Sequence, residues 1–301
     1  MLKPPAPPLS NVALAGIGLM LASVFLFTVN DALGKWMVAA YPVGQFILLR
    51  AAASLVLIAP YAWRGGIAPF RDAPRKGLQL VRIVLATIEM GLFFWAVSYL
   101  PLADTITFWL ATPIYVTALS PLILGEKVGW RRWTAVTIGF IGVVLALRPS
   151  AATFTGPALI AIAGSIVYAF ALMATRALRE TENAVLMTGQ LAGALVLGLL
   201  TLPFGWVTPS PTDLGIVAVI AGFATVAVFC LNRALILAPA TVVTPFQYTM
   251  IVWAVIFGYA MFGDIPDWQM IAGAAIIVGA GIYIFWREQK LGKPPVPIDP
   301  P

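Results

Sequence analysis

The chain has 301 residues, of which 61% are hydrophobic and 10% are charged, and its formal net charge at pH 7 is +6. Soluble globular proteins contain about 25% charged residues, so this composition excludes a soluble domain and predicts a polytopic membrane protein. Its single cysteine, Cys230, and its lack of histidine exclude disulfide frameworks, zinc sites and histidine-based catalysis.

The predicted elements are membrane-spanning helices along the whole chain. The first apolar stretch follows MLKPPAPPLS without an obvious cleavage site, so we expect a permanent helix rather than a signal peptide. Apolar length, with glycine, proline and charge as breaks, predicts ten spans. In chain order they cover residues 11–33, 43–61, 78–99, 103–124, 131–148, 155–176, 184–203, 213–235, 240–262 and 268–286.

Lysine and arginine are distributed unequally between the two sides of the predicted membrane. Of the 18 such residues, Lys35 and Arg148 fall on one side, Arg50 falls inside a helix, and all others fall on the opposite side. Because cytoplasmic loops are enriched in these residues, both termini are predicted to be cytoplasmic. The proline-rich ends, residues 1–10 and 287–301, are predicted to be disordered.

The chain also shows an internal repeat. A shift of 138 residues aligns Pro101 with Pro239, Phe108 with Phe246, Gly125 with Gly263, Glu126 with Asp264, and Trp130 with Trp268. This register predicts two five-helix repeats over residues 11–148 and 149–286. Because five is an odd number, the second repeat must enter the membrane from the opposite side, which is the inverted architecture of many alternating-access transporters.

Two segments resemble a known family. LGEKVGWRRWTAVTIGFIGVVLALRP (residues 124–149) and FGDIPDWQMIAGAAIIVGAGIYIFWRE (residues 262–288) are similar to the fifth and tenth helices of EamA-type transporters, in the drug/metabolite transporter superfamily. The resemblance covers essentially the whole chain, although Asp264 stands where the family more often has glutamate. It implies an all-α protein of ten helices in two inverted repeats, in a bacterial inner membrane. Length and aromatic content are most similar to aromatic amino acid exporters of the YddG type.

Glu89 is a carboxylate near the predicted bilayer midplane, within the apolar run LATIEMGLFFW. An unpaired charge at that depth costs at least about 2.5–3.5 kcal/mol, so Glu89 should face the bundle interior. Arg50 lies at a similar depth, whereas Arg82 is expected to reach the cytoplasmic interface. Glu89 is therefore either a cavity carboxylate that binds protons or a substrate ammonium, or a structural ion pair with Arg50. We favour the ion pair.

Three polar residues cluster at the extracytoplasmic end of the first helix. Asn30 is a candidate for the cavity wall, and Lys35 could form an outer gate that attracts a carboxylate. Asp31 is expected to lie at a solvated helix end.

Aromatic, hydroxyl and amide side chains supply the other cavity candidates, because such walls suit an amphipathic or aromatic solute. These candidates are Phe93, Trp109, Thr112, Tyr115, Tyr168, Gln247 and Tyr248. For any one of them, helix packing is the competing interpretation. Pro113 and Pro245 are expected to interrupt the fourth and ninth helices.

The predicted function is secondary export of small metabolites by alternating access, with aromatic or hydrophobic amino acids as the first expectation. Another small solute of the same superfamily, such as a drug, vitamin or nucleotide-related metabolite, is the alternative. An intramembrane enzyme or a structural membrane protein is the alternative of a different class. The expected partners are a small-molecule substrate and the lipid bilayer. No nucleic acid, metal or cofactor is expected, and the protein is expected to be a monomer.

Overall fold

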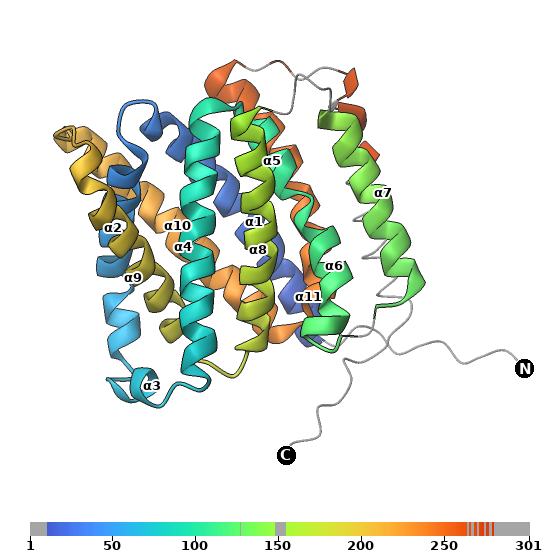
Figure 1. Cartoon of the computed structure of the whole chain (residues 1–301), viewed down its shortest axis with the longest axis horizontal. Helices are drawn as coiled ribbons and strands as arrows, with labels where there is room; N and C mark the ends of the chain where they lie inside the picture. Colours follow the sequence, from blue (N-terminus) through green and yellow to red (C-terminus); the bar gives the residue numbers. More distant parts are fainter. Residues whose placement is uncertain are drawn as a thin grey trace, which may run out of the picture.

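A computed structural model of the chain describes residues 11–126, 128–147 and 155–263, together with isolated positions between 265 and 279. This part of the chain consists of helices and turns (Figure 1). The first half contains α1 (Asn11–Val38), α2 (Val43–Trp63), α3 (Ala68–Arg71), α4 (Lys76–Tyr99), α5 (Leu102–Trp109), α6 (Thr112–Ile123) and α7 (Trp130–Leu147). The second half contains α8 (Gly156–Ala177), α9 (Asn183–Thr201), η2 (Leu202–Phe204), α10 (Pro211–Leu237), α11 (Ala240–Val243), η3 (Thr244–Thr249), α12 (Met250–Phe257) and η4 (Gly258–Phe262).

Eight helical segments of the described chain are long and apolar enough to cross a membrane. The helices α5 and α6 together form one of them, Leu102–Ile123, and α11 to η4 form another, Ala240–Phe262. The predicted span 131–148 is present as the helix α7, but it is not one of the eight. Most of the predicted span 268–286 and both predicted tails lie outside the described residues. The prediction of ten spans is therefore confirmed for eight.

The expected proline breaks are present in both halves. A turn at Leu110 and Ala111 separates α5 from α6, and Pro113 stands in the first turn of α6. Pro245 stands in the first turn of η3, a 3₁₀ stretch inside the equivalent span. Proline removes a backbone donor and clashes with the preceding turn, so it kinks or breaks an α-helix. A side chain with a polar group lies at each break, Trp109 at the first and Gln247 at the second, and both face the centre of the bundle.

Two pairs of positions that the 138-residue register aligns have the same backbone conformation. Pro101 precedes α5 with φ −53° and ψ 148°, and Pro239 precedes α11 with φ −55° and ψ 142°. Gly125 and Gly263 follow the equivalent spans with φ of 67° and 72°. Both are left-handed conformations that strongly favour glycine. Local structure thus agrees with the repeat.

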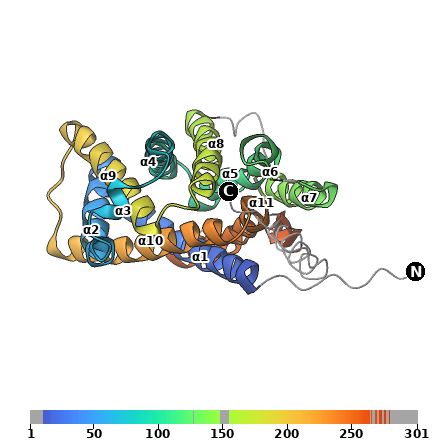
Figure 2. The same cartoon turned by 90° about the horizontal axis from the view of Figure 1, so that it is seen from below.

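Helix packing has the same symmetry. α1 packs along α10 and α4 packs along α8, while α2 packs along α9. The register makes α1 equivalent to α8, α4 to α10 and α2 to α9, so the first two contacts are counterparts and the third is its own counterpart. Figure 2 shows α1 and α10 along one side of the molecule, α4 and α8 along the other, and α2 and α9 at one end. The inverted orientation of the halves in a membrane stays a prediction.

Hydrogen bonds join the two halves at both ends of the bundle. At one end the Tyr41 hydroxyl donates to Asp213 Oδ2 over 2.6 Å, and this bond raises the pKa of the Tyr41 phenol. At the other end Glu126 accepts from the Thr241 hydroxyl over 2.8 Å and lies 3.4 Å from Arg176 Nε. The centre of the bundle is therefore bounded by contacts between first-half and second-half residues.

Candidate functional site

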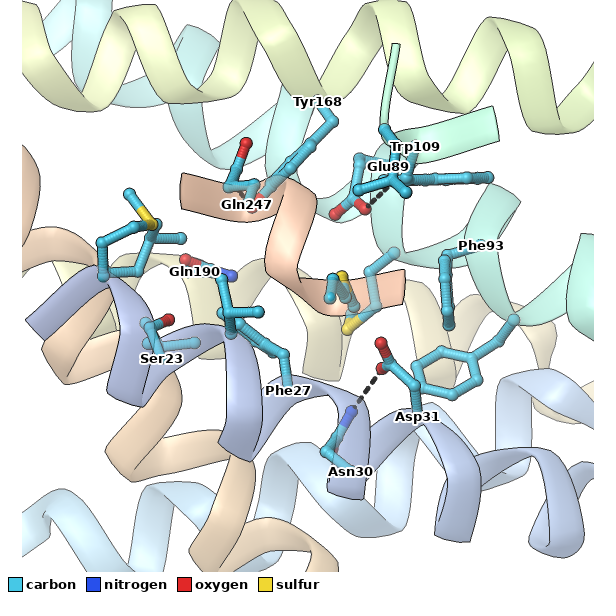
Figure 3. A pocket seen from close by; sticks show the side chains of 18 of the residues that line it. Ser23, Phe27, Asn30, Asp31, Glu89, Phe93, Trp109, Tyr168, Gln190 and Gln247 are labelled. Carbon is cyan, nitrogen blue, oxygen red and sulfur yellow. Dashed lines mark hydrogen bonds between the residues drawn. The ribbon is translucent and has the colours of Figure 1, made fainter. Parts of the chain in front are cut away.

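A cavity of about 110 Å³ lies in the centre of the bundle, between the two halves (Figure 3). Its wall is built by α1, α2, α4 and α5 from the first half and by α8, α9, α10, η3 and α12 from the second. The polar or charged wall residues are Ser23, Asn30, Asp31, Arg50, Glu89, Tyr168, Gln190 and Gln247. Its aromatic wall residues, apart from Tyr168, are Phe27, Phe93, Phe94 and Trp109.

Glu89 is half-buried on α4 and accepts a hydrogen bond from the Trp109 indole Nε1 over 2.8 Å. The Phe93 ring meets the Trp109 ring edge to face, with 5.0 Å between their centroids. Behind the indole lies Gly164 of α8, where a Cβ atom would come within 2.5 Å of the ring. The glycine thus provides the space that lets Trp109 reach Glu89.

A second polar group connects α1 to α2. The Asn30 amide donates to Asp31 Oδ1 over 2.8 Å (Figure 3), and its oxygen accepts from Arg50 Nη1 over 3.1 Å. Arg50 Nη2 contacts the Met90 sulfur, and the guanidinium lies 5.3 Å from the Phe94 ring centroid. Aromatic and amide groups therefore surround this cation.

The expected ion pair between Arg50 and Glu89 is not formed: within the described residues, no hydrogen bond or salt bridge joins them. The expectation that Asp31 lies at a solvated helix end was wrong as well. Asp31 is only 6% exposed and lines the cavity. The α-helical geometry explains the error. Position 31 lies four residues after Phe27 on the cavity face of α1, and this helix continues to Val38, five residues beyond the predicted end at 33.

Tyr168 of α8 and Gln247 of η3 lie next to each other in the cavity wall. The Gln247 amide donates to the Tyr168 hydroxyl over 2.9 Å. The structure thus brings together seven of the predicted residues in the cavity wall: Asn30, Arg50, Glu89, Phe93, Trp109, Tyr168 and Gln247.

The other four predicted residues do not line the cavity. The buried Thr112 hydroxyl donates to the Ser165 carbonyl over 3.3 Å, and Tyr115 packs in the core between α1 and the second half. Tyr248 is fully buried against α7, where a Cβ on Gly139 would lie 2.7 Å from its ring. Packing explains these three positions. Lys35 Nζ donates to the Leu100 carbonyl over 2.7 Å, near the end of α4.

Sequence reasoning did not find Gln190, which lines the cavity from α9. Its signal is a single amide in the middle of an apolar helix. Arg82, expected at the interface, is 3% exposed and points inward. It donates to the Thr175 hydroxyl, the Leu186 carbonyl, the Gln190 amide oxygen and the Asn232 amide oxygen. A ring of second-half hydrogen-bond acceptors therefore holds this arginine in the bundle.

The charges in the cavity wall do not cancel. Two carboxylates, Asp31 and Glu89, accompany one guanidinium, Arg50, so the formal charge is −1 when all three are ionised. An uncompensated charge away from water is expensive, and protons or a cationic solute relieve that cost. In chemical terms, the arrangement can hold a proton or a small cationic molecule.

Fold and cavity together define a membrane transporter, an α-helical bundle whose two halves enclose a central polar site. The chain belongs to the EamA-like transporter family, which matches it over residues 14–148 and 155–286.

Curated relatives are named as transporters. The chain is 25% identical over 280 residues to an S-adenosylmethionine uptake transporter of Rickettsia felis, covering 92% of this chain and 94% of the relative. It is 28% identical over 279 residues to a riboflavin transporter of Vibrio cholerae, covering 91% and 94%. One solved crystal structure shares the fold, with a TM-score of 0.71 and 18% identity over 90% of this chain and 99% of that one. These names favour the expected alternative, a vitamin or nucleotide-related solute, over the export of aromatic amino acids.

Proposed function

We propose that this protein is a secondary transporter that takes up a small metabolite with a planar ring and a net positive charge, of the chemical class of S-adenosylmethionine. The observation behind this proposal is the charge of the cavity. Asp31 and Glu89 face it together with a single cation, Arg50. S-adenosylmethionine has the complementary set: a sulfonium and an ammonium opposite the two carboxylates, and a carboxylate opposite the guanidinium.

The aromatic wall suits the adenine ring of such a solute. The Phe93 ring meets two other rings edge to face: its centroid lies 5.3 Å from that of Phe94 and 5.0 Å from that of Trp109. Side chains of this kind stack with planar rings and also contact organic cations through their faces. The name of the Rickettsia relative, an S-adenosylmethionine uptake transporter, supports this class of substrate and uptake as the direction of transport.

Riboflavin is the second candidate, because its flat ring also fits aromatic walls and a Vibrio cholerae relative is named for it. Riboflavin is uncharged at neutral pH, so its binding would leave the net charge of the cavity uncompensated. A zwitterionic aromatic amino acid has no net charge and leaves the same imbalance. Electrostatics therefore ranks S-adenosylmethionine first.

The size of the cavity implies movement during transport. Sites for drug-sized ligands have volumes of about 300–1,000 Å³, whereas this cavity has about 110 Å³. The helices must separate before such a solute can enter. Because both halves line the cavity, it widens when the two halves move apart. No nucleotide-binding motif is present in the sequence to couple this movement to ATP.

Ligand-induced stabilisation of the purified protein in detergent tests the proposal. A ligand that binds only the folded state at 100 times its Kd stabilises it by about 2.7 kcal/mol. We expect S-adenosylmethionine to raise Tm, and riboflavin and phenylalanine to leave it unchanged. A rise with riboflavin or phenylalanine, but none with S-adenosylmethionine, would refute the assignment and leave the transporter class intact.

A further inference from the structure

Arg50 lies between the central cavity and a smaller void on its α9–α10 side. The void has about 20 Å³, and Arg50, Met90 and Gln190 line both spaces. Thr225 of α10 adds a hydroxyl to the wall of the void. A space of this volume holds about one water molecule or one group of similar size. The cavity and the void are therefore neighbours, and an arginine lies between them.

The guanidinium has hydrogen-bonding capacity left over. Arg50 is 8% exposed, and its Nη1 and Nη2 contact Asn30 and Met90. Its Nε is buried and has no hydrogen-bond partner in the described part of the chain. Both nearby carboxylates are engaged elsewhere, Asp31 with Asn30 and Glu89 with Trp109. A buried donor on a cation strongly favours an anionic acceptor.

Arg82 provides the internal comparison. It is also buried, but its Nε and both terminal nitrogens donate to Thr175, Leu186, Gln190 and Asn232. The donors of Arg82 are thus occupied by protein groups, as expected of a structural arginine. Arg50 has fewer such partners, Asn30 and the Met90 sulfur, and its Nε has none in the described part of the chain. Arg50 also lines the cavity.

We infer that Arg50 and the adjoining void form a carboxylate-binding subsite, which selects substrates that contain an α-amino-acid group. The inference rests on the proposed function and deepens it. Arginine presents a planar fork of donors that matches a carboxylate, so one substrate oxygen lies at the void and the other faces the cavity. The substrate's ammonium and sulfonium then lie on the side of Asp31 and Glu89.

Competition between two ligands tests this subsite. Purified full-length protein in liposomes takes up labelled S-adenosylmethionine, and unlabelled S-adenosylmethionine or its decarboxylated analogue competes. The analogue has a higher net positive charge, so a negative cavity without a carboxylate subsite would bind it more tightly. The inferred subsite predicts the opposite: wild-type protein prefers the carboxylated compound by roughly tenfold to a hundredfold.

Variants at position 50 complete the test. Arg50→Gln is expected to abolish or reverse the preference, and Arg50→Lys, which keeps the charge but not the fork, is expected to keep part of it. Arg64→Gln, at an exposed position at the end of the same helix, is the matched control and should behave like wild type. Because each preference compares two ligands in one sample, it does not depend on how much protein folds.

The outcomes separate this inference from the proposed function. If wild-type protein takes up S-adenosylmethionine but binds the analogue equally well or better, the subsite is refuted and the function stands. The same holds if Arg50→Gln keeps the wild-type preference. If uptake requires chloride and shows no preference between the two ligands, Arg50 binds a free small anion instead. If wild-type protein takes up no S-adenosylmethionine, the proposed function itself fails.

Discussion

At the scale of the residue, Glu89 illustrates how one hydrogen bond leaves a charge available for a solute. The Trp109 indole fixes its Oε1 at 2.8 Å, and no cation of the described chain forms a salt bridge with it. The carboxylate is therefore oriented without a salt-bridge partner. In a site with little water, such a group attracts a cationic ligand far more strongly than it would at the surface.

Replacing this charge should weaken substrate binding without weakening the fold. Glu89→Gln keeps the size of the side chain and an oxygen acceptor for Trp109, and we expect the Kd for S-adenosylmethionine to rise about tenfold to a hundredfold. Stability should stay the same or increase, because a charge without a salt-bridge partner is removed from the bundle interior. Equilibrium binding and Tm measure the two effects. Glu182→Gln, at an exposed loop position, is the control, and a variant that binds like wild type would contradict the role.

At the scale of the element, close contacts between helices fix the walls of the cavity. α9 lies so near α2 that a Cβ atom on Gly198 would be 2.6–2.8 Å from the Cβ, Cα and backbone nitrogen of Leu48. Backbone atoms cannot move aside as a flexible side chain can. This contact therefore sets the position of α2, the helix that contains Arg50.

Gly198→Ala should destabilise the protein by about 1–3 kcal/mol, because the added methyl group overpacks a backbone contact. Gly222→Ala on α10 is the matched control: its Cβ would have no neighbour within 4 Å, so helix propensity alone should make it neutral or slightly stabilising. Unfolding in a denaturing detergent measures both. Equal stability of the two variants would show that the α2–α9 contact is looser than described.

Arg82 joins α4 to three helices of the other half, through Thr175 on α8, Gln190 on α9 and Asn232 on α10. Arg82→Met would fill similar space but leave these acceptors without their donor. Each buried group left unsatisfied costs about 1–3 kcal/mol, so we expect a clear fall in Tm. Arg64→Gln should leave Tm unchanged. A stable Arg82→Met protein would mean that these acceptors find other donors.

At the scale of the whole molecule, most of the fold could be predicted from the sequence. Apolar length identifies the spans, and Pro113 and Pro245 stand at the broken helices. Both signals are local. The cavity was harder to predict, since its composition depends on how helices rotate against one another. The sequence predicts Asp31 at a solvated helix end and Arg82 at the cytoplasmic interface, yet both are buried, and Arg82 donates to Asn232 far along the chain. Tyr248 has the same chemistry as Tyr168 but faces α7 instead of the cavity.

The orientation in the membrane is a further prediction of the whole chain. The bias of lysine and arginine places both termini in the cytoplasm. A fluorescent protein fused to the C-terminus should therefore be bright in a bacterial host, and alkaline phosphatase at the same place should be inactive. The reverse pattern, a dark fluorescent protein and an active phosphatase, would contradict the prediction that the C-terminus is cytoplasmic.

The central claim is that the negative central cavity transports a cationic metabolite, and uptake of labelled S-adenosylmethionine by proteoliposomes tests it most directly. With an inside-negative membrane potential, wild-type protein should show saturable uptake that unlabelled S-adenosylmethionine inhibits and riboflavin does not. The double variant Asp31→Asn, Glu89→Gln should lose most of this uptake while remaining folded. Uptake no greater than in protein-free liposomes, or uptake unchanged in the double variant, would contradict the account.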